Sequence, residues 1–299
     1  MEYSVEINDL TKNFGGFCAL KNINLKITPG EVFAYIGPNG AGKSTTIRIL
    51  LGILQATKGS ARLFGKDAWK DAVEIHKRIA YVPGDVNLWP NLTGGEVIDL
   101  FVNLREKENK ELRNKLVADF NLDPSKKCRT YSKGNRQKVA LIAAFASDAD
   151  LYILDEPTSG LDPLMEQVFQ DYVERQKKAG KGVFLSSHIM SEVERLCDRV
   201  GIIREGEIAR VGTLDELRSL SRYVVSVSCE REIDGLEKIE GVFEFSSEYD
   251  SYLGAKIYNF NADANKMGAI INHIAQFGIK KLDSRPPSLE DLFMSHYEK

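Results

Sequence analysis

The glycine-rich segment 37–45, GPNGAGKST, restricts the fold of this 299-residue chain more than any other stretch. The apolar run EVFAYI comes directly before it and a helical pattern follows, so the segment turns a buried strand into a helix. It fits the pattern G-x-x-x-x-G-K-[S/T], in which wrapped backbone N–H groups and the helix N-terminus face a chain of phosphates. The residues expected to bind these phosphates are Gly37, Pro38, Asn39, Gly40, Ala41, Gly42, Lys43, Ser44 and Thr45.

Two side chains of this segment have separate expected roles. The Lys43 ammonium is expected to neutralise the β and γ phosphates of the ligand, and the Ser44 hydroxyl to ligate Mg²⁺. A chance glycine-rich turn is the alternative. The strand–loop–helix context that the pattern requires is present, and it favours the phosphate-binding interpretation.

A second apolar run, LYILDEP at residues 151–157, ends in two carboxylates. Open α/β sheets bind their ligands at the carboxyl ends of the strands. Asp155 is therefore expected to hold Mg²⁺ through water, and Glu156 to polarise an attacking water as a general base. Such an acidic pair alone is typical of a turn or a helix start, but its combination with a phosphate-binding segment favours catalysis.

The order of apolar runs predicts an α/β fold for residues 1–220. Short continuous runs such as LYILD and GVFLSS are typical of parallel strands buried on both faces, and helical segments lie between them. The strand signal disappears between about residues 90 and 147, where we expect an inserted helical subdomain. Capping-box spacing marks three predicted helix starts, at Thr93 with Glu96, Ser191 with Glu194 and Thr213 with Glu216.

Residues 221–299 show a different pattern and are predicted to form a small α+β domain. The run YVVSVSC alternates in the manner of a half-buried strand, and Ser288 with Asp291 opens a predicted final helix, SLEDLFMSHY. No catalytic constellation is visible in this part, so regulation or dimer formation is its expected role. One face of a helix that stops at Gly278 carries Met267, Ile270, Ile271, Ile274 and Phe277.

Charge and hydropathy argue against several functional classes. A formal net charge of −3 gives no support for a nucleic-acid binder with a general basic surface. No apolar run approaches the length of a membrane-spanning helix, and the N-terminus, MEYSVEIND, is too acidic and polar for a secretory signal. Any membrane role therefore needs a partner. Reduced thiols of a cytoplasmic protein are the simplest interpretation of the scattered Cys18, Cys128, Cys197 and Cys229.

Three further motifs follow in a fixed order. YSKGNRQK, residues 131–138, precedes the helical run VALIAAFAS, TSGLD ends at Asp162, and FLSSHIM ends another buried strand at His188. Together with the phosphate loop and the acidic strand, this order resembles the ATP-binding subunits of ABC transporters across essentially all of residues 1–220. The resemblance implies a P-loop NTPase core of the ABC ATPase type, with ATP and Mg²⁺ as ligands.

The resemblance also implies roles for residues outside the phosphate loop. Phe14 matches the aromatic residue that stacks on adenine, and Asp162 matches the D-loop residue at the subunit interface. Ser132 and Gly134 match the signature that reaches the γ-phosphate bound by a second subunit. His188 matches the switch histidine that contacts the γ-phosphate, although a lone histidine after a strand is otherwise more often structural.

The implied active form is a head-to-tail dimer with two ATP molecules between its subunits, either a homodimer or a heterodimer with another ATP-binding subunit. One open loop supplies donors to the four phosphate charges from one side only, and a second subunit supplies the others and excludes water. Lys133 and Asn135 depart from the commonest signature, Leu-Ser-Gly-Gly-Gln, but polar residues are common variants there.

Gly84 is the main departure from the family pattern. The strand that reads IAYV in this chain usually leads into a loop that begins with glutamine, whose side chain approaches Mg²⁺ and the attacking water. Glycine lacks that contact unless the loop shifts and Asp85 replaces it, and a dispensable contact is an equal alternative. We expect hydrolysis to survive with slower or less regulated turnover.

The sequence therefore predicts an ATP-hydrolysing subunit that powers transport through separate integral-membrane permease subunits, peripheral on the inner face of the cell membrane. The closing run PPSLEDLF resembles the drug- and antibiotic-export branch of these ATPases and favours export. An importer ATPase, a soluble ABC ATPase acting on ribosomes or DNA, and a degenerate module that uses ATP as a dimerisation ligand are the alternatives. The substrate stays open, because the permease subunits line the pathway.

Overall fold

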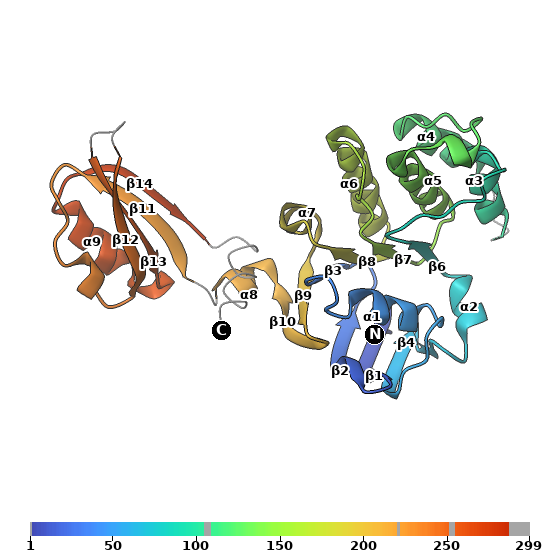
Figure 1. The fold of residues 1–299 in the computed structure, drawn as a ribbon, viewed down its shortest axis with the longest axis horizontal. Helices are drawn as coiled ribbons and strands as arrows, with labels where there is room; N and C mark the ends of the chain where they lie inside the picture. The colour runs from blue at the N-terminus through green and yellow to red at the C-terminus, as the bar shows by residue number, and fades with distance from the viewer. Residues whose placement is uncertain (1, 105–108, 220–221, 251–254, 287–299) are drawn as a thin grey trace. The chain divides into compact units, whose positions relative to one another are not determined.

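A computed structural model describes residues 2–104, 109–219, 222–250 and 255–286. The chain forms two compact units, residues 1–211 and 212–299 (Figure 1). The sequence pattern changes after residue 220, and the separate functional roles assigned to the two parts stay predictions. The final helix predicted from Ser288 lies outside the described residues.

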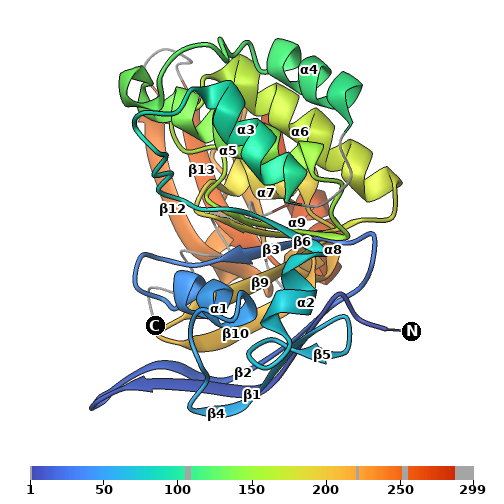
Figure 2. The same cartoon turned by 90° about the vertical axis from the view of Figure 1, so that its right-hand side faces the viewer.

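A six-stranded sheet of order β10-β9-β3-β8-β7-β6 forms the centre of the larger unit. The pairs β3–β8, β3–β9, β7–β8 and β6–β7 are parallel, which confirms the predicted α/β fold. Every residue of β3 and β8 is buried, because helices lie on both sides of the sheet (Figure 2). The strands are β3 (Val32–Ile36), β6 (Ile79–Val82), β7 (Leu151–Asp155), β8 (Gly182–Ser187), β9 (Arg199–Arg204) and β10 (Glu207–Thr213).

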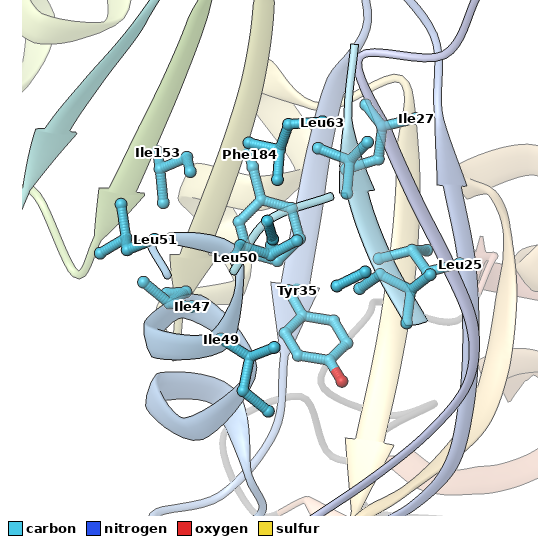
Figure 3. Packing of buried hydrophobic residues seen from close by; sticks show 14 of the residues in the cluster. Leu25, Ile27, Tyr35, Ile47, Ile49, Leu50, Leu51, Leu63, Ile153 and Phe184 are labelled. Atoms are coloured by element: carbon cyan, nitrogen blue, oxygen red, sulfur yellow. The ribbon is translucent and has the colours of Figure 1, made fainter. Parts of the chain in front are cut away.

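A second, antiparallel sheet of order β2-β1-β4-β5 lies across helix α1 (Lys43–Leu50) from the parallel sheet (Figure 1). The helix fills the space between them: Leu50 packs in one cluster with Tyr35 and Phe184 of the parallel sheet and with Leu25 of β2 (Figure 3). This core fixes the start of α1 against the end of β3. The strands are β1 (Val5–Phe14), β2 (Phe17–Ile27), β4 (Lys58–Leu63) and β5 (Lys66–Asp67), and α2 (Ala72–His76) follows them.

The described residues between 90 and 147 contain three α-helices, α3 (Gly94–Asn103), α4 (Lys110–Asp119) and α5 (Lys133–Ala146), as the sequence predicts. Helix α3 begins with the predicted capping box. The Thr93 hydroxyl accepts the N–H of Glu96 at 3.2 Å, and the Glu96 carboxylate accepts the N–H of Thr93 at 2.6 Å.

Two helices flank strand β8. The longer, α6 (Pro163–Lys178), precedes it, and α7 (Met190–Leu196) follows it. The capping box predicted at Ser191 is wrong, because the N-cap of α7 is Ile189, two residues before Ser191. The chain turns before Ser191, since the Ile189 N–H donates to the Ser187 hydroxyl at 3.0 Å. Within the described ranges, every helix is too short or too polar to cross a membrane.

The smaller unit contains an antiparallel sheet of order β12-β13-β11-β14 with α9 packed on it, an α+β arrangement. Val225 and Val227 of β11 share a buried cluster with Ile270 and Ile274 of α9, as the two periodicities predict. The capping box at Thr213 is confirmed by reciprocal hydrogen bonds with Glu216. The elements are α8 (Leu214–Ser219), β11 (Tyr223–Cys229), β12 (Val242–Asp250), β13 (Ala255–Ala262), α9 (Met267–Ala275) and β14 (Ile279–Arg285).

Candidate active site

The phosphate loop, residues 37–45, connects strand β3 to helix α1 as predicted. Gly42 has a φ of +114°, and a Cβ at this position would lie 2.6 Å from the Leu20 side chain. A Cβ at Gly37 would collide with the carbonyl oxygen of Ile203. Only glycine fits these two positions, so the backbone wraps tightly in front of the α1 N-terminus, whose N–H groups attract anions. This cradle fits a chain of phosphates.

Lys43 is the first residue of α1, and its side chain is folded into the loop. Its ammonium donates to the carbonyl oxygens of Gly37 at 2.6 Å and Pro38 at 3.1 Å. Burial lowers the pKa of Lys43, while the negative charges of Glu156 and Asp155 act in the opposite direction. Both carboxylates thus lie within electrostatic reach of the ammonium, and the phosphate loop and the acidic strand form one site.

The Asp155 carboxylate lies between two hydroxyl groups at the end of β7. Ser44 Oγ donates to its Oδ2 at 3.4 Å, and Ser186 Oγ donates to its Oδ1. Hydroxyl and carboxylate oxygens are the ligands that Mg²⁺ prefers, and a Mg²⁺ bound with a nucleotide takes its other ligands from phosphates and water. The side chains of Ser44 and Asp155 therefore fit the predicted Mg²⁺ site.

Glu156 follows Asp155 in a left-handed backbone conformation, with a φ of +47° that non-glycine residues seldom adopt. Its N–H donates to the carbonyl and hydroxyl oxygens of Ser186, at 3.0 and 3.2 Å. Its Oε1 lies 3.4 Å from Nδ1 of His188, whose side chain is 60% exposed. The structure thus brings the predicted general base and the predicted switch histidine together at the ends of two neighbouring strands.

The signature residues Ser132 and Gly134 lie at the start of α5. The Ser132 hydroxyl caps this helix by accepting the N–H of Asn135 at 3.3 Å. A Cβ on Gly134 would collide with the carbonyl oxygen of Gly160, so only glycine permits this approach. Within one chain, the signature therefore packs against the segment that follows the acidic strand.

Two side chains of α5 bind the same segment. The Lys133 ammonium donates to the Ser159 hydroxyl at 2.6 Å. The buried Gln137 amide donates to the carbonyl oxygen of Pro157 at 2.9 Å. Residues 157–159 are consequently hydrogen-bonded to the first half of α5.

Asp162 caps helix α6. Its carboxylate accepts the N–H of Met165 at 3.0 Å, and Pro163 occupies the first helical position. This structural role is sufficient to explain the residue within one chain. Its predicted place at a subunit interface stays a prediction.

Comparisons with known proteins agree with this geometry. The family model described as ABC transporter matches residues 20–159. YhaQ of Bacillus subtilis, an uncharacterized ABC transporter ATP-binding protein, is 32% identical over 294 residues, 96% of each chain. This chain belongs to the ABC transporter ATP-binding proteins. It is therefore an ATPase of the ABC type, which confirms the predicted activity.

Two further comparisons cover most of this ABC ATPase. BcrA of Enterococcus faecalis, a bacitracin transport ATP-binding protein, is 27% identical over 298 residues, which cover 98% of this chain and 96% of BcrA. A solved ATP-binding subunit of an ABC transporter superposes with a TM-score of 0.69 at 32% identity, covering 72% of this chain and 92% of that subunit. The likeness to BcrA thus includes the smaller unit.

Phe14 ends strand β1 of this ABC ATPase, opposite Phe17 in the hairpin. Its side chain is 48% exposed, and the Lys12 ammonium lies 4.9 Å from the ring centroid. An exposed ring beside a cation fits the predicted stacking on adenine, which stays a prediction.

Gly84 lies beside the Asp155 carboxylate. A Cβ at this position would be 3.2 Å from the carbonyl oxygen of Asp155 and 3.8 Å from its Cγ. Asp85 is exposed, and its carboxylate accepts a hydrogen bond from Asn87 Nδ2 at 3.4 Å. Position 84 therefore lies next to the acidic strand, but glycine provides no side chain there. The Asp85 carboxylate is hydrogen-bonded to Asn87 instead.

An apolar groove with a volume of about 560 Å³ lies next to this loop. Residues of α2, β6, α3 and α5 line it, together with residues of segment 83–89 and the turn after α1. Trp89 and Leu104 are 52% and 71% exposed. Tyr81 belongs to the lining, and burial together with the Asp155 charge raises its pKa to about 12, against the opposing effect of Arg48. The Tyr81 hydroxyl therefore lies within electrostatic reach of the Asp155 carboxylate.

Sequence reasoning missed three buried polar residues around the site, Ser186, Gln137 and Glu192. The sequence feature that could have identified them is a polar residue within an apolar run, as for Ser186, or about one helical turn after a motif residue, as for Gln137 and Glu192. Such positions are visible in the sequence, but the partners that satisfy them come from other elements.

Proposed function

We propose that this ABC ATPase powers export through separate membrane permease subunits, as a head-to-tail dimer that binds two ATP molecules between its subunits. The observation that carries hydrolysis is the cluster of Lys43, Ser44, Asp155, Glu156 and His188 at the strand ends. The proposal assigns to each of these groups a task in one reaction.

In this assignment the phosphate loop binds ATP, and Lys43 exchanges its carbonyl partners for the β and γ phosphates. Ser44 and Asp155 would hold Mg²⁺, which when bound neutralises phosphate charge. Glu156 orients the attacking water and takes its proton. His188, 3.4 Å from Glu156, donates toward the γ-phosphate and so shares the water-directing role.

Dimer formation follows from the distribution of donors. The phosphate loop approaches a nucleotide from one side, whereas the capped start of α5 with Ser132 and Gly134 provides a second set of backbone donors. In one chain, Gly134 is packed against Gly160. A second copy that presents its own signature residues to the first copy's phosphates would complete the donor set and exclude water.

The apolar groove supports the permease partner. It carries the exposed side chains of Trp89, Leu104 and Val73, more apolar surface than a solvated groove normally keeps. Its lining includes Pro83 and Val86, which lie on either side of Gly84 and Asp85 in the chain. A permease segment bound there would place the chain on the inner face of the membrane and would sense changes at the acidic strand.

The proposed direction, export, rests on the resemblance of the closing run PPSLEDLF to the drug- and antibiotic-export branch. The likeness to BcrA extends over 98% of this chain and thus over both units. The name of BcrA describes bacitracin transport, so an antibiotic is the proposed substrate class. Co-purification of the chain with a permease whose transport needs no soluble substrate-binding protein would support export. A requirement for such a binding protein would contradict it.

The first test of hydrolysis measures Mg-ATP turnover by the full chain over a range of protein concentrations, alongside Glu156→Gln. We expect the rate per subunit to rise with concentration and to fall about 10²–10⁴-fold in the variant. Glu174→Gln, an exposed change on α6, is the matched control and should retain the wild-type rate.

The outcomes separate the parts of the proposal. A concentration-independent rate would contradict dimer-dependent catalysis. A Glu156→Gln variant with the wild-type rate would contradict the assigned general base. A near-zero rate in both chains, restored only by the permease, would show that the partner is needed to assemble the site.

A further inference from the structure

Two segments at the site, residues 156–162 and 187–189, form what we call the switch region. Glu192 of α7 lies behind them, one helical turn after His188, and only 4% of its surface is exposed. Its Oε2 accepts a hydrogen bond from Ser187 Oγ at 2.6 Å. Ser187 Oγ in turn accepts the N–H of Ile189 at 3.0 Å. Both neighbours of His188 are thus bonded into one unit with Glu192.

Burying a carboxyl group costs free energy unless its atoms are hydrogen-bonded, so the burial of Glu192 indicates a specific role. The other oxygen, Oε1, is buried and has no hydrogen-bond partner among the described residues. Burial raises the pKa of Glu192, while the hydroxyls of Ser187 and Thr158 lower it. The charge of Glu166 on α6 raises it further, and His188 acts in the opposite direction.

The neighbours of Glu192 come from both parts of the switch region. Thr158 belongs to the segment that follows the general base, and Ser187 to the segment that carries the histidine. The same two segments line a small pocket of about 220 Å³ that includes Glu156 and His188. Glu192 is therefore placed to hold one segment in register with the other.

His188 needs such support because its own side chain is poorly held. The imidazole is 60% exposed, and its Nδ1 lies 3.4 Å from Glu156 Oε1. A long, exposed contact fixes a side chain weakly. The direction of the imidazole consequently depends on the backbone at residues 187–189, which the hydrogen bonds of Ser187 fix.

We propose that Glu192 is a positioning residue for hydrolysis, which acts through Ser187 to hold His188 against Glu156. The inference rests on the role assigned to His188 under the proposed function. Glu192 itself contacts neither nucleotide nor water in this scheme, so its loss misdirects the histidine and leaves the phosphate loop intact.

The test measures kcat and KM for ATP of the full chain with Glu192→Ala and Glu192→Gln, each alone and combined with His188→Ala. Glu192→Ala should lower kcat about tenfold, which corresponds to about 1.4 kcal/mol in the barrier, with KM within about twofold. Glu192→Gln should restore kcat, because an amide oxygen still accepts from Ser187. Glu194→Ala on the same helix is the control and should retain the wild-type kcat.

The decisive readout is the double variant. If Glu192 acts through His188, adding Glu192→Ala to His188→Ala lowers kcat no further. Full additivity of the two losses, or a loss confined to KM, overturns the inference. If Glu192→Ala does not fold, Ser187→Ala replaces it, since it removes the same link with a smaller change and must show the same non-additivity.

The controls also separate this inference from the proposed function. A wild-type chain without turnover, or His188→Ala with full turnover, contradicts the assigned catalytic site and overturns the inference with it. A normal wild type, an impaired His188→Ala and additive losses contradict the role of Glu192 alone.

Discussion

The phosphate loop and the switch region lie at the ends of neighbouring strands of one sheet, but they hold their shapes in different ways. The shape of the loop depends on its backbone, because neighbouring atoms leave no space for a side chain at Gly37 or Gly42. Around the switch region, the buried side chains of Ser186, Gln137 and Glu192 bond to the segments that carry the candidate catalytic groups. The loop therefore depends on glycine backbone, whereas the switch region depends on hydrogen bonds from buried side chains.

The largest expected effect comes from a substitution in the phosphate loop. Gly42→Ala places a Cβ at a φ of +114° and 2.6 Å from Leu20, a strain of roughly 1–3 kcal/mol that shifts the loop. We expect ATP turnover to fall about a hundredfold, since small misplacements of binding groups have large effects. Turnover and nucleotide affinity are measured beside Gly16→Ala, whose Cβ has open space. Equal turnover in the two variants would contradict the steric argument.

The next largest effect is expected from the loss of a buried hydrogen bond to the switch region. Gln137→Leu leaves the carbonyl oxygen of Pro157 without its buried donor, which should lower the free energy of unfolding by about 1–3 kcal/mol. Urea denaturation of the full chain measures it. The control, Gln167→Leu, alters an exposed glutamine on α6 and should cost less than about 0.5 kcal/mol. A smaller loss for Gln137→Leu than for the control would show that the buried bond contributes little.

A smaller effect is expected at Gly84, which lies beside Asp155. Gly84→Gln introduces a side chain next to Asp155, where the Cβ already approaches the carbonyl oxygen within 3.2 Å. We expect basal or permease-stimulated turnover to rise by less than about tenfold, as the amide gains access to Mg²⁺ and the attacking water. Asp85→Asn is the matched control for a change at the exposed neighbour. Unchanged basal and stimulated rates in Gly84→Gln would show that the missing contact is dispensable.

The smallest expected effect is a pH dependence of the switch region. Burial raises the folded-state pKa of Glu192 above its ordinary value of 4.5, so the folded chain holds this proton more tightly than the unfolded chain. The stabilisation is fully present below pH 4.5 and is lost as the pH rises through the folded-state pKa. Glu192→Gln does not titrate, so its stability relative to wild type should increase over that range.

Melting temperatures of the two chains, measured from pH 4.5 upward, check this difference. Glu194→Gln on the same helix is the control, because it leaves the buried carboxyl in place. A constant difference between wild type and Glu192→Gln at every pH would contradict a buried group that titrates in this range.

Much of the fold was predictable because its signals are local. Continuous apolar runs identified β3, β7 and β8, and the glycine pattern placed the turn into α1. The capping box at Thr93 was correct, because both of its hydrogen bonds join residues within the motif itself. The one at Ser191 was wrong, because a hydrogen bond to Ser187, outside the motif, starts the helix earlier.

The sequence by itself determined the family and the phosphate loop. It also predicted Asp155, Glu156 and His188 as site residues, because each belongs to a short motif at a strand end. Only the tertiary structure decided what surrounds them. In the folded chain, the Ser186 hydroxyl is hydrogen-bonded to both Asp155 and Glu156. Gly84 lies beside Asp155, and Glu192 is buried one helical turn after His188. The physical reason is that a motif fixes its local backbone, whereas a buried polar side chain obtains its partner from whichever element the core packs against it.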